Sequence, residues 1–303
     1  MNVVGAILLS LTLVACQASQ GPTPQGASSG GQAAPQPPVP SRIRLTAPTD
    51  FFVSPTGSDQ SDGLTRATPW LTLQHAYDTI KNNYDLAGYV VTINLADGTY
   101  GPVNGKDNVV YCDGYMVGQV LDVRFMGNPG HPENVIIQGR SNNIFEIMNT
   151  RINVDGMTLT GTGSTVGLLS YFGARITFSH LIFGPMGTGI HLSAAGGIII
   201  PFSGYTISGD AGYHMLSNTP GSRIDVGNKI IQIENSPRFS SAFAVAENLG
   251  FISAYGDKFP GTPATGTRYI IERNGVIQTS GGPDYFPGDA PGSAATGGIY
   301  VGN

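Results

Sequence analysis

The chain has 303 residues, which is enough for a sizeable core and for one or two domains. Glycine occupies 43 positions and charged residues make up only 12%, about half the usual share, so the composition favours a fold rich in turns and strands. The net charge is −5 and no basic run is present, which argues against nucleic acid as a partner. With only two cysteines, Cys16 and Cys112, the chain has neither a disulfide framework nor a metal-type cysteine spacing.

The first 16 residues have the features of an export signal. Val3 to Val14 are almost wholly apolar, too short to span a bilayer and of the length of a signal-peptide core. They end in Leu13-Val14-Ala15-Cys16, which resembles the bacterial lipobox and implies lipidation of Cys16. Gln17 resembles the residue found in lipoproteins sent to the outer membrane. Because Met1-Asn2 lacks the expected positive charge, another exported form and an uncleaved start stay open.

We therefore expect residues 1–16 to be a signal peptide and the protein to reside at the outer membrane or cell surface. Its membrane contact would be through a lipid on Cys16 alone, and Cys112 would then be a small buried hydrophobe. Residues 17–40 carry no charge and no aromatic ring, so they cannot bury enough surface to order themselves. We expect a flexible Pro/Gly/Ser/Gln linker over residues 17–48.

Residues 49–105 are expected to cap a larger structure. A strand beginning at Phe51 runs into a polar turn, and a helix follows, with Thr68 as its N-cap and Pro69 at its first position. This helix would bury Leu73, Ala76, Tyr77 and Ile80. A second strand, over residues 89–95, ends at Asp97-Gly98-Thr99-Tyr100. The segment resembles the entry segment of pectate-lyase-like β-helix proteins, in which a helix covers the exposed end of a solenoid.

Two acidic residues, Asp59 and Asp62, lie in the polar turn of this cap. Acidic loops bind calcium, so the pair is a weak candidate site for that ion. An Asx turn is the commoner reason for aspartate in such a place. No other metal or cofactor is expected.

A short phrase recurs over residues 151–277. It reads Phe172-Gly173-Ala174-Arg175-Ile176 in one copy and Pro220-Gly221-Ser222-Arg223-Ile224 in another. Self-similarity at about 24 residues indicates a solenoid. We align its isoleucines as one inward ladder of Ile152, Ile176, Ile198, Ile224, Ile252 and Ile277.

Three strands per coil are visible around this ladder. Arg151 to Asp155 alternates polar and apolar residues, as a half-buried strand does. A second strand carries Leu159, Phe183, Ile207 and Ile233 in one column, and a third is marked by residues 167–169, 189–191 and 269–271. We predict an all-β, right-handed parallel β-helix with coils over residues 106–280, the hand following from the crossover rule. A β-propeller is the alternative, but its repeat is longer.

The last segment, residues 281–303, is expected to close the solenoid. Ser280 to Gly288 and Ala294 to Tyr300 resemble the ends of β-helix proteins of the phage tail-fibre and tailspike type. The resemblance implies a virion surface as the alternative location and is compatible with a homotrimer.

The outer face carries the candidate binding residues. If the isoleucines point inward, the residues before them form an outward column of Arg151, Arg175, Gly197, Arg223, Phe251 and Val276. Stacked arginines repel one another, so something must compensate. Asp155 together with solvent is one solution, and an acidic polysaccharide held by the guanidinium groups is the other. Outward Ile199, Phe251 and Tyr255 would form an apolar patch for sugars or for a subunit.

No catalytic constellation is secure in the sequence, and the catalytic residues stay unknown. Pectate-lyase relatives use a calcium-binding carboxylate cluster and a base, and glycoside hydrolases use carboxylates about 5 to 9.5 Å apart. Asp155 and Asp225 are too far apart for such a pair. Asp113, Asp122 and Glu133 in the early coils, or a neighbouring subunit, could complete a site. His191 and His214, 23 residues apart, are expected to form a structural column.

Two functions follow from these features. The first is a non-catalytic surface protein that binds a glycan or partner through Arg151, Arg175, Arg223, Phe251 and Tyr255. The alternative is a polysaccharide lyase or glycoside hydrolase acting on an acidic polysaccharide. A purely structural role is the third reading. The fold alone does not decide between them.

Overall fold

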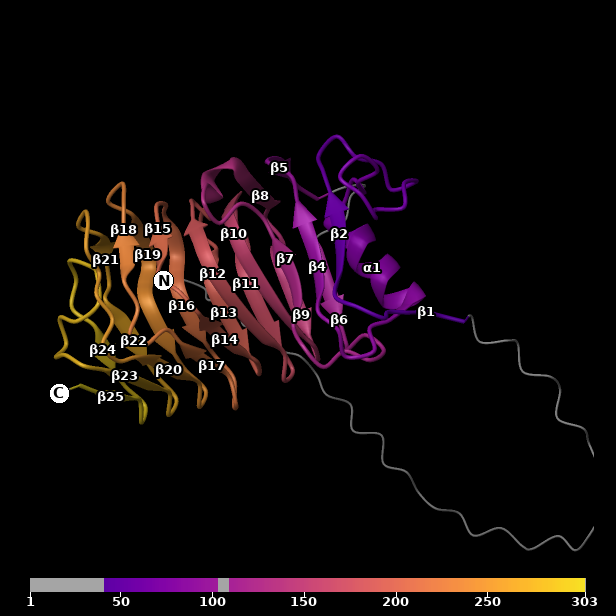
Figure 1. The fold of residues 1–303 in the computed structure, drawn as a ribbon. Coiled ribbons are helices and arrows are strands. Elements are labelled where there is room, and N and C mark those ends of the chain that lie inside the picture. Colours follow the sequence, from indigo (N-terminus) through magenta and orange to yellow (C-terminus); the bar gives the residue numbers. More distant parts are fainter. Residues whose placement is uncertain (1–40, 103–108, 303) are drawn as a thin grey trace, which may run out of the picture. The chain divides into compact units, whose positions relative to one another are not determined.

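A computed structural model describes residues 41–102 and 109–302. The predicted signal peptide, Cys16 and most of the predicted linker lie outside the described residues. The described chain is an all-parallel β-solenoid of about 7 turns with roughly 25 residues per turn and a helix near its N-terminal end (Figure 1). This confirms the predicted β-helix. No described helix has both the length and the apolar character that a membrane crossing requires.

The larger of the two main sheets contains 14 strands of the described residues. Its principal path consists of β2 (Thr49–Val53), β4 (Val91–Leu95), β7 (Val123–Met126), β10 (Arg151–Thr162), β12 (Arg175–Phe183), β14 (Ile198–Pro201), β17 (Arg223–Asp225), β20 (Phe251–Ala254), β23 (Val276–Thr279) and β25 (Ile299–Val301). Its second part adds β5 (Gly98–Tyr100), β8 (Val135–Arg140), β15 (Tyr205–Ile207) and β18 (Ile231–Ile233).

The smaller main sheet contains nine described strands and supplies the third side of each coil. They are β6 (Val110–Asp113), β9 (Asn143–Met148), β11 (Val166–Tyr171), β13 (Ile190–Ala195), β16 (Ala211–Ser217), β19 (Arg238–Ala246), β21 (Thr265–Gly266), β22 (Tyr269–Ile271) and β24 (Ser293–Ala294). The remaining elements are β1 (Ile43–Arg44), β3 (Tyr84–Asp85), the helix α1 (Leu73–Asn83) and the 3-10 turn η1 (Pro132–Asn134).

The inward ladder differs from the predicted one at a single residue. Ile176 pairs with Ile199, and Ile199 pairs with Ile224, so Ile198 is outside the column in which it was expected. Ile199 is fully buried and Ile198 only half-buried. The predicted register was therefore wrong in this coil and right in the others. The second column is confirmed, because Leu159, Phe183, Ile207 and Ile233 pair in succession.

From residue 149 onward the register is set by a left-handed residue at one corner of each coil. A residue with positive φ lies three positions before every inward residue of the ladder, and the series is Asn149, Gly173, Gly196, Gly221, Leu249, Asn274 and Gly297. The left-handed region favours Gly and Asn, which explains most of these choices. In the coil with Gly196-Gly197, the glycine that adopts this conformation is Gly196, with φ 87°. The predicted ladder instead placed Ala195 level with Gly173, and this shifted the register of the coil by one residue.

A second left-handed position divides each long strand into two parts. Gly156 and His180 both have positive φ and lie level with one another, between paired residues on either side. In β10 the buried inward residues are Ile152 and Val154 before this position and Met157 and Leu159 after it. Gly156 in β10, like His180 in β12, is thus one extra residue in the inward–outward alternation of side chains. Because of it, alternate side chains on both sides of that position point into the core.

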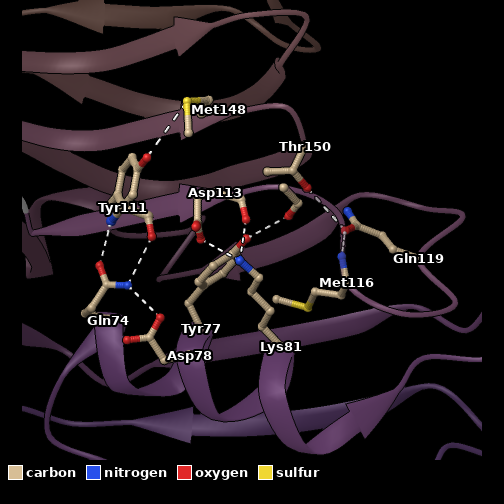
Figure 2. Close-up of polar contacts among 11 residues, drawn as sticks. Gln74, Tyr77, Asp78, Lys81, Tyr111, Asp113, Met116, Gln119, Met148 and Thr150 are labelled. Carbon is tan, nitrogen blue, oxygen red and sulfur yellow. Dashed lines mark hydrogen bonds and ion pairs between the residues drawn. The ribbon is translucent and has the colours of Figure 1, made fainter. Parts of the chain in front are cut away.

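The cap protects the free edge of β6, which is the last strand of the smaller sheet. The side-chain amide of Gln74 accepts from the Tyr111 N–H at 2.6 Å and donates to the Tyr111 carbonyl at 3.0 Å (Figure 2). Lys81 Nζ binds Asp113, and Tyr77 Oη donates to the Gly114 carbonyl. Helix α1 therefore satisfies backbone groups that an open strand edge would leave unpaired.

The helix begins later than the sequence predicted. Its N-cap is Thr72, whose hydroxyl accepts from the His75 N–H, and not Thr68. Residues 68–70 precede the helix, and Trp70 forms a parallel bridge to Val53. The predicted buried residues Leu73, Ala76, Tyr77 and Ile80 are confirmed, as is the burial of Cys112.

Two predicted boundaries also change. The linker was expected to extend to residue 48, but β1 pairs with β3 at residues 43–44 and Leu45 is buried. The coils were expected to end at residue 280, with residues 281–303 closing the solenoid. Within that segment β25 continues the larger sheet, with Ile299 paired to Val276 and Tyr300 paired to Ile277. Both changes extend the ordered solenoid.

Candidate functional site

The predicted arginine column is present on the outer face of the larger sheet. Arg151 pairs with Arg175, Arg175 with Ile198, Ile198 with Arg223, and Arg223 with Phe251. Ile198 thus replaces Gly197 in this column. Ile199, which was expected to belong to an outward apolar patch, is buried inside the solenoid.

A pocket of about 340 Å³ lies over β7, β10 and β12 at one end of this column. Three arginines, two carboxylates and several apolar side chains surround it: Val90, Val120, Leu121, Asp122, Arg124, Met126, Arg151, Asn153, Asp155, Arg175, Ser179 and Phe202. Its volume is in the range of small-ligand sites. The mixture of guanidinium groups and apolar walls suits a ligand that is both acidic and partly apolar.

Asp122 is the group that compensates the stacked arginines. It precedes Val123, which pairs with Ile152, so Asp122 lies level with Arg151. Its Oδ1 is 2.8 Å from Arg175 Nη2 and 3.7 Å from Arg151 Nε, and its Oδ2 accepts from the Thr177 hydroxyl at 3.1 Å. The Asp122 side chain is only 13% exposed. The expectation that Asp155 compensates was therefore wrong, because Asp155 pairs with His180 instead.

Arg124 contributes the remaining cation. It lies level with Asn153, and its side chain is exposed at the pocket. Within the described residues no carboxylate or aromatic ring pairs with its guanidinium group, whereas Arg151 and Arg175 share Asp122. Arg124 therefore keeps its hydrogen-bond donors available to an anion.

One wall of the pocket is the loop that leads into β7. Val120 and Leu121 are 58% and 48% exposed and line the pocket. Gln119 fixes this loop to β10, because its amide donates to the Arg151 carbonyl at 2.9 Å. The same amide accepts from the Thr150 hydroxyl (Figure 2). The loop therefore holds Asp122 and the apolar wall against the arginines.

Phe202 also lines the pocket. Pro201 pairs with Phe178, so Phe202 lies level with Ser179, and its ring is 63% exposed. An exposed aromatic ring beside guanidinium groups offers a stacking surface to a sugar.

The other predicted site residues lie outside this pocket. Arg223 forms an ion pair with Asp225, and its guanidinium carbon is 5.4 Å from the centre of the Phe251 ring. Tyr255 is 44% exposed at the far end of β20. The structure therefore brings Arg151 and Arg175 into one pocket and leaves Arg223, Phe251 and Tyr255 further along the same face.

Asp122 and Asp155 both line the pocket, and each carboxylate has its own partners. Asp122 binds Arg175 and the Thr177 hydroxyl, and Asp155 binds His180. Asp113 binds Lys81 and Glu133 binds His131, so the early carboxylates suggested by the sequence have different partners.

Asp155, which lines the pocket, pairs with His180, which is not among the residues that line it. Asp155 Oδ1 is 2.8 Å from His180 Nδ1, and the His180 side chain is half exposed with positive φ. An Nδ1–H that donates to a carboxylate leaves Nε2 as a base. The sequence analysis missed His180 because a left-handed position there, level with a glycine in β10, carries no signal in the alternation of residues.

The two calcium candidates are occupied by hydrogen bonds. Asp59 accepts from the N–H groups of Leu71 and Thr72 and from the Thr72 hydroxyl. Asp62 accepts from the Leu64 N–H in an Asx turn and from the Thr68 hydroxyl, and the latter bond lowers the pKa of its carboxyl group. The residues that the structure describes contain no group of three or more His, Cys, Asp or Glu side chains arranged for a metal ion. Calcium binding stays a prediction.

His191 and His214 are neighbours inside the solenoid, as their spacing predicted. Leu192 pairs with Met215, so the two histidines lie level, and both are fully buried. Their rings meet edge to face, with centroids 5.3 Å apart. They belong to an aromatic core and not to the outer pocket.

Comparison of this chain with protein families, with characterised proteins and with solved structures gives no match.

Proposed function

We propose that the protein binds an acidic glycan in the pocket over β7, β10 and β12. The observation that carries the proposal is the convergence of Arg124, Arg151 and Arg175 on one cavity of about 340 Å³. Guanidinium forks suit carboxylates, and Asn153 and Ser179 add hydrogen-bonding groups for hydroxyls. Phe202 and the apolar wall at Val120 and Leu121 support the faces of the sugar rings.

The proposed setting is the outer membrane or the cell surface, with Cys16 as a lipid anchor. This part rests on the resemblance of residues 13–16 to a lipobox. A virion surface, suggested by the resemblance of residues 280–300 to tail-fibre proteins, is the alternative. Kinship with pectate-lyase-like proteins is likewise a proposal, supported by the three-strand coils and the capping helix.

The test is a binding measurement with the full chain against oligogalacturonate, hyaluronate and neutral dextran. We expect binding of the acidic chains, no binding of dextran, and weaker binding in added salt. Arg124→Gln should lower the affinity about tenfold, as expected for loss of a charge-assisted hydrogen bond. Arg140→Gln, an exposed arginine at the end of β8, is the matched control and should bind as the wild type does. Equal affinities of wild type and Arg124→Gln for every acidic chain would rule out the pocket.

A polysaccharide lyase is the second candidate, favoured by the Asp155–His180 pair beside the arginine pocket. In such a reaction the arginines neutralise a uronate carboxylate, and His180 Nε2 removes the proton on the adjacent ring carbon. The electron pair forms the ring double bond, the neighbouring glycosidic C–O bond breaks, and the leaving oxygen takes a proton. No co-reactant is required.

Incubation with oligogalacturonate distinguishes the two candidates. A lyase yields an unsaturated product that absorbs in the ultraviolet, and His180→Gln should abolish that product while binding persists. Binding without any product, at several pH values, would leave a non-catalytic binder.

A further inference from the structure

The pocket contains its own counter-ion, and this limits the charge that a ligand can bring. Arg124, Arg151 and Arg175 supply three positive charges, and Asp122 and Asp155 supply two negative charges. Asp122 is not a loose surface group, because it is held by Arg175, by Arg151 and by the Thr177 hydroxyl and is largely buried. A ligand cannot push it aside without breaking these contacts.

We propose that Asp122 makes the pocket selective for a glycan that presents one carboxylate there, and against heavily sulfated chains. This inference rests on the proposed glycan-binding function. With Asp122 in place, one guanidinium group, that of Arg124, remains without a carboxylate partner among the described residues. A single carboxylate matches that excess, whereas further sulfates meet the Asp122 and Asp155 carboxylates at close range, and like charges so placed disfavour binding.

The contrast with Arg223 supports a role in selectivity beyond mere charge balance. Arg223 also has a neighbouring aspartate, Asp225, but that pair lies outside the pocket and its arginine is half exposed. Asp225 therefore serves as a matched control. Asp225 forms the same type of ion pair with an arginine on the same face of the solenoid, but this pair does not line the pocket.

The experiment compares oligogalacturonate, with one carboxylate per residue, and heparin oligosaccharides of equal length, with several sulfates per disaccharide. Wild-type full-length protein should bind oligogalacturonate about tenfold more tightly than heparin. Asp122→Asn keeps the oxygen that Arg175 contacts but removes the charge, so it should bind heparin about tenfold more tightly than the wild type does, with a steeper salt dependence. Asp225→Asn should change neither affinity.

Each outcome decides a separate point. A wild type that prefers heparin, or a folded Asp122→Asn variant with unchanged selectivity, would overturn the role of Asp122 while leaving glycan binding intact. Absence of binding to both acidic probes would overturn the proposed function and this inference with it. Should Asp122→Asn fail to fold, the preference of the wild type still decides the selectivity.

Discussion

His191 Nδ1 and His214 Nδ1 lie 3.0 Å apart inside the solenoid, so one of them must donate a proton and the other must accept it. Burial lowers the pKa of both rings, so both are neutral. His191 Nε2 is 3.1 Å from the Gly184 carbonyl, which can only accept, so in the neutral ring the proton is on Nε2 and Nδ1 is the acceptor. His214 then donates from Nδ1, and its Nε2 accepts from the Tyr205 hydroxyl at 2.8 Å.

Acid should therefore destabilise the solenoid through this pair. Burial lowers the pKa of His191 to about 4 and the pKa of His214 well below its usual value. The unfolded chain binds a proton at each ring below about pH 6.5, whereas the folded chain does not, so the free energy of unfolding falls as the pH drops from 6.5 towards 4. Near pH 5 the two rings together lower the free energy of unfolding by roughly 2 to 3 kcal/mol for each pH unit of acidification.

Denaturant unfolding between pH 7 and pH 4 measures this effect. Replacing both histidines by phenylalanine should reduce the dependence on pH, and His131→Gln, at an exposed histidine, should not. A pH dependence identical in the double variant and the wild type would contradict the assignment.

Asp257 should act in the opposite direction over much of the same range. Burial raises the pKa of its carboxyl group to about 7, and its Oδ2 has no hydrogen-bond partner among the described residues. The folded chain retains this proton between about pH 4 and 7 while the unfolded chain loses it, so stability falls as the pH rises through this window.

Asp257→Asn removes the charge that is buried at alkaline pH. We expect it to raise the free energy of unfolding by about 2 to 4 kcal/mol at pH 8, and to have little effect at pH 4. Asp284→Asn, at a side chain that is 87% exposed, is the control. Denaturant unfolding at the two pH values checks this, and equal shifts at pH 4 and pH 8 would count against a buried charge.

The corrected register predicts opposite results at two consecutive residues. Ile199→Ala removes a fully buried side chain and should cost about 2 to 5 kcal/mol. Ile198→Ala alters the outer face and should cost less than about 1 kcal/mol. Thermal or denaturant unfolding of the two variants measures the difference. Similar losses in both would show that the ladder does not run through Ile199.

Gln74 should be required for the edge of β6. Its amide makes two bonds to the backbone of Tyr111, so Gln74→Ala should cost about 1 to 3 kcal/mol. The amide hydrogen of Tyr111 should also exchange faster with solvent. Gln232→Ala, on the outer surface of β18, is a suitable comparison. Unchanged exchange at Tyr111 would mean that α1 does not protect this edge.

The sequence predicted the solenoid because inward residues repeat, and that repetition is imposed by burial. Leu159, Phe183, Ile207 and Ile233 align without error because each is the second of two buried residues that are separated by one half-buried residue. The register failed at Ile198 because three consecutive isoleucines carry no alternation, so the choice between Ile198 and Ile199 depends on which residue adopts the left-handed corner, and that residue is Gly196. Thr177 is a second residue whose burial the sequence does not predict. Its polar side chain is on the outer face, but it is buried because its hydroxyl bonds to Asn153 and Asp122.

The site was harder to predict than the fold. Arg151 and Arg175 were found because they share a position in the repeat. Arg124 lies in an earlier coil that lacks the recurring phrase, although Val123 to Met126 alternates in the same way as Ile152 to Asp155. Asp122 enters the site through a loop whose path depends on Gln119 and not on a repeat.

From residue 149 onward, the left-handed corner residue fixes where the inward residue of its coil lies, since the inward residue always follows it by three positions. Extra residues elsewhere in a coil therefore enlarge a loop and do not move the next inward residue. The 28 residues that separate Ile224 from Ile252 are accommodated in this way, since the two still pair directly. New loops can therefore be grafted between the corners of one coil without disturbing the stack above or below it.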